Sequence, residues 1–160
     1  MSDKETLIWL SEHNINEKNI LENYELKLSE QLPVDSGVKN YLAKEIASIF
    51  NKNEVLLYIN EYGVWPSSEN MYLFDGYRKS IEIESKIYEK PSHIIGENEN
   101  IEFYCILGMI LYFYMGCMII PIKNQDEIIK ISHDEFIEVY TKNKTNENII
   151  LNEIKKIMNK

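Results

Sequence analysis

The sequence predicts an α+β fold with one domain, in which a mixed or antiparallel sheet of about five strands has flanking helices and one buried central helix. Three observations predict it. Segments with an apolar period of two, typical of strands, occur beside segments with apolar residues three and four positions apart, typical of helices. These segments do not follow a strict β-α-β alternation, and the last three strand patterns are consecutive. The length of 160 residues fits one domain.

The N-terminal part, residues 1–23, is predicted to be a helical segment ahead of the α+β domain, which spans residues 24–160. Leu7, Ile8 and Leu10 around Trp9 give residues 4–13 a short helical pattern. No glycine- or serine-rich linker or internal repeat separates further domains.

The first strand pattern covers residues 24–29, where apolar and polar residues alternate as in a half-buried strand. Asp35 or Ser36 then caps a helix over residues 38–50. Its apolar residues share one face because they are spaced by three and four positions: Val38, Tyr41, Leu42, Ile46 and Phe50.

The nearly continuous apolar run at residues 55–59 predicts a buried strand near the middle of the sheet. A corner rich in glycine, proline and aromatic residues follows at 62–66. Ser67 or Ser68 is placed to cap the next helix, which extends to about Ser80.

Residues 81–87 alternate like a strand but run into a loop-like segment at 86–95, so both interpretations stay open there. A helix over residues 101–114 is hydrophobic nearly all round, which predicts burial on every side.

The C-terminal part is predicted to hold three consecutive strands and one helix. The strand patterns cover residues 117–122, 127–132 and 135–141. Ser132, His133 and Asp134 suit the tip of a hairpin between the last two. The final helix begins at Thr145 or Asn146 and carries an isoleucine stripe.

The uncharged run at residues 103–122 is long enough to cross a bilayer. Gly116 and Pro121 interrupt it, however, its second half is rich in β-branched residues, and no basic cluster flanks it. We therefore expect a buried helix followed by a buried strand and no membrane span.

The net charge of −9 makes nucleic acid a poor partner and a basic protein a better one. Cys105 and Cys117 lie in apolar sequence, which predicts buried, reduced thiols. The N-terminus lacks the features of a signal peptide. Together these features predict a cytoplasmic protein.

No motif in the sequence predicts catalysis or a cofactor. The glycines form no phosphate-binding loop, and helix capping accounts for Ser67 and Ser68. The three histidines lack the spacing of metal ligands, so we expect no metal. An alternative is a metal or acid-base site formed by His93, His133 and a carboxylate such as Glu69, brought together by folding.

Arg78 is the only arginine beside sixteen lysines, and it follows a cluster of aromatic residues that includes Trp65. Its planar guanidinium either anchors a carboxylate such as Glu61 or Glu69 inside the fold or binds a partner at the corner. Trp65 is expected to pack on the core as part of the corner, with an exposed binding role as the alternative.

Four motifs carry a resemblance to a known family: PVDSG at 33–37, YINEYGVWPSSEN at 58–70, PSH at 91–93 and ISHDE at 131–135. In this order they resemble a family of small uncharacterised bacterial proteins that is similar to the immunity proteins of toxin systems. The resemblance covers residues 24–141, and it implies bacterial origin and one compact domain.

The leading hypothesis is a non-enzymatic immunity protein that occludes a cognate toxin, a basic protein domain, with an acidic face containing aromatic residues. The alternatives are a small enzyme or ligand-binding protein with its site at the Trp65–Glu69 corner, and an adaptor subunit of a bacterial defence complex. The predicted partner-binding residues are Glu61, Tyr62, Trp65, Ser68, Glu69, Tyr72, Arg78, His133 and Asp134.

Overall fold

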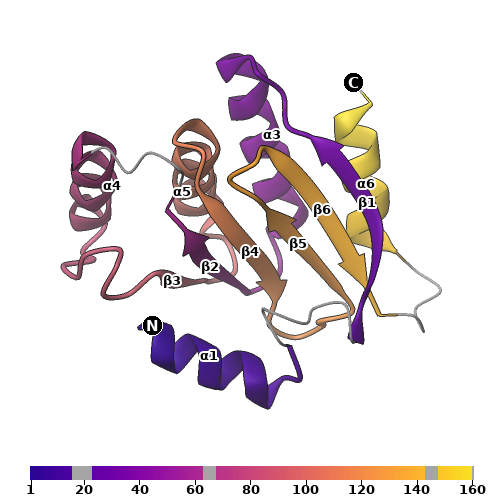
Figure 1. Cartoon of the computed structure of the whole chain (residues 1–160), viewed down its shortest axis with the longest axis horizontal. Coiled ribbons are helices and arrows are strands. Elements are labelled where there is room, and N and C mark those ends of the chain that lie inside the picture. Colours follow the sequence, from indigo (N-terminus) through magenta and orange to yellow (C-terminus); the bar gives the residue numbers. More distant parts are fainter. Residues whose placement is uncertain (16–22, 63–67, 143–147, 160) are drawn as a thin grey trace.

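The computed structural model describes residues 1–15, 23–62, 68–142 and 148–159. Within these residues the chain forms five helices and one six-stranded sheet, which confirms the predicted single α+β domain (Figure 1). The sheet has six strands instead of about five.

All strand pairs in the sheet are antiparallel, and the order is β1-β6-β5-β4-β2-β3. The bounds are β1 (Glu25–Gln31), β2 (Val55–Glu61), β3 (Ser92–Ile95), β4 (Gly116–Pro121), β5 (Glu127–Ile131) and β6 (Phe136–Thr141). Every residue of β4 is buried, as expected for an interior strand covered on both faces.

The helices are α1 (Asp3–Glu12), α3 (Ser36–Ile49), α4 (Ser68–Ser80), α5 (Asn100–Tyr112) and α6 (Ile149–Met158). Asp35 is the cap of α3, because its carboxylate accepts a hydrogen bond of 3.0 Å from the Val38 N–H. The main core lies between the sheet and the helices α3, α5 and α6, which cover the same face (Figure 1).

Helix α1 packs against the opposite face of the sheet. Its Leu10 belongs to a second apolar cluster with Leu56, Met118, Ile128 and Tyr140. These strand residues lie toward one end of the sheet, and Figure 1 draws α1 there, away from the turn that joins β5 to β6. Among the residues that the structure describes, only one end of the second face is therefore covered by a helix.

Two predictions need correction, one about the loop-like segment at 86–95 and one about the burial of α5. The loop-like segment contains β3, which pairs with β2 and buries the polar residues Ser92 and His93. Residues 81–87 form turns and no strand. Helix α5 is buried on one side only: Tyr104, Cys105 and Met109 are half-buried and Tyr112 is exposed. Cys117 is buried as predicted, whereas the predicted burial of Cys105 is wrong because this side chain is half-buried.

The long uncharged run is divided between α5 and β4. Tyr114, with a φ of 55°, lies in the turn that ends the helix. In the part of the chain that the structure describes, no helix has the length and apolar character needed to cross a membrane.

Candidate binding surface on the open face of the sheet

The predicted partner-binding residues do not all meet at one place. Glu61 ends β2, while His133 and Asp134 form the β5–β6 turn, and these three residues come together. Tyr72 and Arg78 lie on α4. Trp65 and the side chains of Ser68 and Glu69 fall outside the described residues, as does the predicted cap Ser67.

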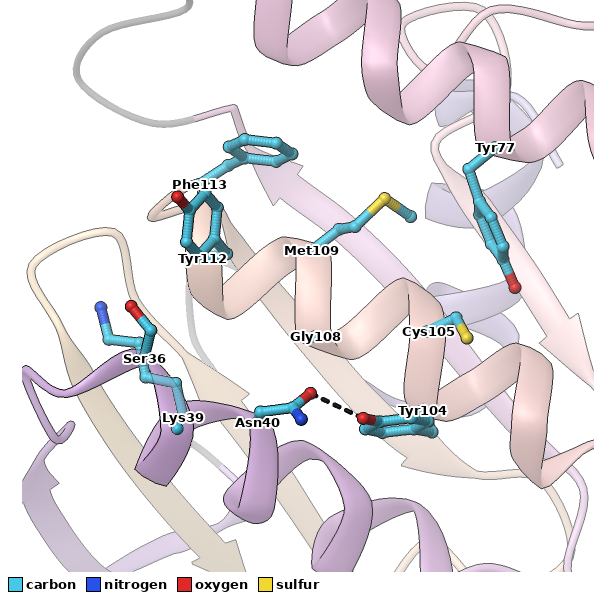
Figure 2. A pocket seen from close by; sticks show the side chains of 11 residues that line it. Ser36, Lys39, Asn40, Tyr77, Tyr104, Cys105, Gly108, Met109, Tyr112 and Phe113 are labelled. Carbon is cyan, nitrogen blue, oxygen red and sulfur yellow. Dashed lines mark hydrogen bonds between the residues drawn. The ribbon is translucent and has the colours of Figure 1, made fainter.

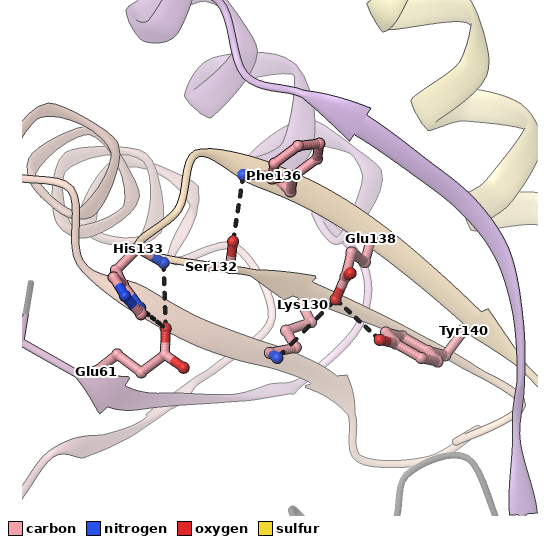
Figure 3. Close-up of polar contacts among 7 residues, drawn as sticks. All are labelled: Glu61, Lys130, Ser132, His133, Phe136, Glu138 and Tyr140. Carbon is pink, nitrogen blue, oxygen red and sulfur yellow. Dashed lines mark hydrogen bonds and ion pairs between the residues drawn. The ribbon is translucent and has the colours of Figure 1, made fainter.

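Glu61 and His133 form the centre of the surface (Figure 3). One carboxylate oxygen of Glu61, Oε2, accepts hydrogen bonds from the His133 backbone N–H at 3.1 Å and from the ring Nδ1 at 2.8 Å. The other ring nitrogen, Nε2, lies 3.4 Å from Asp134 Oδ1. The imidazole is thus held between two carboxylates.

The backbone of β2 and β4 places Glu61 at this position. The register between these strands shifts between Ile59 and Glu61, a bulge that re-aims the strand end. Glu61 lies directly over Gly116, where an added Cβ would be 2.8 Å from the Glu61 Cβ. Gly116 is required because any side chain there would displace the carboxylate.

The hairpin tip predicted for residues 132–134 is confirmed. Ser132 and Phe136 close the turn through their backbones at 2.9 Å, and the Ser132 hydroxyl accepts a further hydrogen bond of 3.3 Å from the Phe136 N–H. Glu135 has a φ of 66°, which completes the tight reversal. The turn therefore presents the His133 ring from a fixed backbone.

The strands beside the hairpin add residues that sequence reasoning missed. Lys130 and Glu138 are directly opposite each other in the β5–β6 register, with Lys130 Nζ and Glu138 Oε2 4.0 Å apart. Tyr140 donates a hydrogen bond of 2.8 Å to the same oxygen. Phe136 is 39% exposed. The alternation of residues 135–141 could have identified the residues from β6, because in a strand it places Phe136, Glu138 and Tyr140 on one face.

We call this surface the hairpin face; it consists of Glu61, Lys130, His133, Asp134, Phe136 and Glu138. It combines three carboxylates with one lysine and an exposed aromatic ring. Such a surface offers hydrogen-bond acceptors to a basic partner and an apolar contact beside them.

The Glu61–His133 contact shifts the pKa values of both groups. Partial burial by itself favours the neutral Glu61 carboxyl, but the hydrogen bonds and the charge of His133 outweigh it and lower the pKa of Glu61. The hydrogen bond to Glu61 raises the pKa of His133, against a smaller opposing effect of desolvation. The ion-paired state is therefore favoured in weakly acidic solution.

Arg78 is buried inside the fold, with 1% of its surface exposed, and so is not on the hairpin face. Its Nη2 donates to the Lys90 carbonyl at 2.8 Å and to Ser85 Oγ at 3.4 Å. Its Nη1 lies 3.7 Å from Asp75 Oδ1. Anchoring inside the fold is confirmed, with Asp75, one helical turn earlier, as the carboxylate. The suggested partner Glu61 is wrong, because Glu61 pairs with His133, and the side chain of Glu69 lies outside the described residues.

His93 and His133 belong to different sites. His93 lies opposite Leu57 in the β2–β3 register, four residues before Glu61, which is about 13 Å along a strand. Burial, with the charges of Arg78 and the N-terminus, lowers the pKa of His93 to about 3. Among the described residues, no group of three or more His, Cys, Asp or Glu side chains is placed to hold a metal ion.

The two tyrosines predicted to bind a partner have different environments. Tyr62 is half-buried and packs against the main core, whereas Tyr72 is 76% exposed on α4.

Comparisons of the chain with protein-family models, curated proteins and solved structures returned no match. The residues of the hairpin face are therefore the features of the protein that bear on its function.

Proposed function

We propose that the protein is a non-enzymatic bacterial binding protein, and specifically a cytoplasmic immunity protein that neutralises a cognate toxin by covering it. The observation that supports this proposal most directly is the convergence of Glu61, His133 and Asp134 on a sheet face that α1 leaves uncovered. The expected partner is a basic toxin domain.

The composition of the hairpin face supports a protein partner. Phe136 offers an exposed ring for a pocket on the partner, and aromatic residues are common anchors of interfaces. The carboxylates around it suit lysine and arginine side chains. The overall charge of −9 adds a long-range field that accelerates association with a basic protein at low salt.

Co-expression with a toxin encoded beside this gene tests the proposal. The wild-type protein is expected to rescue growth and to co-purify with the toxin. Two variants, Phe136→Ala and Asp134→Lys, remove the exposed ring and reverse a charge that is 73% exposed, and both are expected to weaken the complex at least tenfold.

Glu153→Lys is the matched control, because it makes the same charge reversal on α6, which covers the other face of the sheet. It is expected to leave rescue and co-purification unchanged. The proposal is rejected if the wild-type protein fails to rescue and to co-purify. The assignment of the toxin-binding site to the hairpin face is rejected if Phe136→Ala and Asp134→Lys bind the toxin as well as the control Glu153→Lys does.

A further inference from the structure

A hollow of about 650 Å³ opens in the helix layer, between α3 and α5 and beside Tyr77 of α4 (Figure 2). It is formed by the half-buried side of α5, which carries Tyr104, Cys105, Gly108, Met109 and Tyr112. We call it the α3–α5 groove. Its volume is within the range of about 300–1,000 Å³ that is typical of small-molecule sites.

The walls of the groove are mainly apolar and aromatic. The Tyr104 hydroxyl donates a hydrogen bond of 2.7 Å to Asn40 Oδ1, which fixes these two side chains across the groove (Figure 2). Gly108 leaves room at the middle of α5, because an added Cβ there would meet only Asn40 Oδ1, at 3.9 Å. The groove is therefore a formed site for an apolar chain.

Lys39 lines one end of this groove and is 96% buried, with an exposure of 4%. Its ammonium group lies 3.9 Å from the centre of the Tyr114 ring, and no described residue supplies it with a carboxylate. Lys39 is also in the first turn of α3, where the helix dipole disfavours a cation. The ammonium group therefore contacts the Tyr114 ring and has no carboxylate partner among the described residues, so it can pair with an anion at this end of the groove.

A second, smaller hollow adjoins the groove at Lys39. The two hollows share Ser36, Lys39, Tyr112 and Phe113. The Lys39 side chain runs along the α3 side of the groove, and the Ser36 hydroxyl lies at the same end (Figure 2). An anionic group at this end would meet the ammonium, while an attached chain would extend along Tyr104 and Met109.

We propose that the α3–α5 groove binds an anionic amphiphile, a carboxylate that carries an unbranched apolar chain. The carboxylate pairs with Lys39, and the chain replaces water on the aromatic walls. The observations favour a small molecule over a helix of a partner protein, because one lysine and a hollow of limited volume match a single charged head and its tail. The site is independent of the proposed toxin binding, since the hairpin face is on the other side of the sheet.

Calorimetric titration with laurate, below its critical micelle concentration, tests this proposal on the full chain. Laurate is expected to bind, and dodecanol, which has the same chain without the charge, is expected to bind at least tenfold more weakly. Lys39→Met keeps the apolar part of the side chain. It is expected to weaken the binding of laurate at least tenfold and to leave the affinity for dodecanol unchanged.

Gly108→Leu is the second variant, because it fills the groove without removing a contact, and it is expected to abolish binding of both probes. Circular dichroism confirms that each variant is folded. The proposal is overturned if laurate does not bind, if laurate and dodecanol bind equally, or if Lys39→Met leaves laurate affinity unchanged. It is also overturned if the groove is occupied by something else that excludes laurate, either a second copy of the chain in a stable dimer or a peptide helix.

Discussion

Glu61 holds both the backbone and the ring of His133 through one carboxylate oxygen, at 3.1 Å and 2.8 Å. The two residues are 72 positions apart in the chain, and their contact joins the end of β2 to the β5–β6 turn. The orientation of the His133 ring on the hairpin face therefore depends on Glu61, and removal of that carboxylate affects stability and surface geometry together.

Glu61→Gln is expected to lower the free energy of unfolding by about 0.5–1 kcal/mol, because the pair is a partly exposed ion pair. The lowered pKa of Glu61 means that its contribution is present above about pH 4.5 and is lost as the pH falls through the pKa in the folded protein. The raised pKa of His133 means that its contribution is present below about pH 6.5 and is lost as the pH rises through the folded pKa.

The difference between the wild-type protein and Glu61→Gln is thus expected to be largest between about pH 4.5 and 6.5. Urea unfolding at a series of pH values measures it. Asp134→Asn is the control, since Asp134 is 73% exposed and more distant from the ring, and its effect is expected to be smaller. A difference that is independent of pH would contradict the pairing.

Gly116→Ala tests the close approach of β4 to Glu61. The new methyl group would collide with the Glu61 side chain and push it away from His133, so stability is expected to fall by about 1–3 kcal/mol. Glu61→Gly in the same chain removes the obstacle, because the Glu61 Cβ is itself one of the atoms that the new methyl group would meet. The double variant is expected to lose less than the sum of the two single losses in urea unfolding. Simple additivity would show that the two residues do not interact.

Gly76→Ala is the matched glycine control. Gly76 lies inside α4, and an added Cβ there meets nothing within 4 Å. Alanine is expected to stabilise the protein by about 0.5–1 kcal/mol, because it favours a helix more than glycine does. Loss of stability on this substitution in urea unfolding would contradict the open environment of Gly76.

Most of the fold follows from periodicity along the sequence. The helices and five of the strands have apolar residues at regular intervals, and these patterns depend only on neighbours in the chain. Strand β3 escaped the sequence reasoning because it has four residues, follows Pro91 and buries a serine and a histidine. Its place in the sheet is set by pairing with β2, which no local pattern records.

The candidate sites depend more on long-range contacts. The sequence singled out Glu61 and His133 but gave no reason to pair them. Burial of α5 on all sides was expected from its composition, yet residues that line a groove and residues that fill a core have the same apolar character. Lys39 carried no signal, since its burial appears only when α3 and α5 are packed together.

Arg78→Lys is expected to lower the free energy of unfolding by about 2–4 kcal/mol. A lysine cannot contact Asp75, Ser85 and the Lys90 carbonyl from one planar group, so buried polar atoms are left without partners. Urea unfolding measures the loss. Lys79→Ala, at the neighbouring exposed position, is the control and is expected to change stability by less than about 0.5 kcal/mol. Equal effects of the two substitutions would contradict the anchoring role.

Glu127 in β5 caps helix α6 from outside the helix. Its two carboxylate oxygens accept hydrogen bonds from the Ile150 N–H at 2.8 Å and the Leu151 N–H at 3.0 Å, and its side chain is buried. The residue at the N-terminal cap position, Asn148, provides no such bond. A carboxylate at the positive end of the helix dipole is favourable, so β5 supplies the cap that the helix itself lacks.

Two substitutions of Glu127 are therefore expected to give graded losses in urea unfolding. Glu127→Gln keeps one acceptor oxygen and is expected to cost about 1 kcal/mol, whereas Glu127→Ala leaves both N–H groups buried without acceptors and is expected to cost about 2–3 kcal/mol. Glu153→Gln, on the exposed side of α6, is the control and is expected to cost less than about 0.5 kcal/mol. Equal losses for glutamine and alanine would show that only one of the two hydrogen bonds stabilises α6.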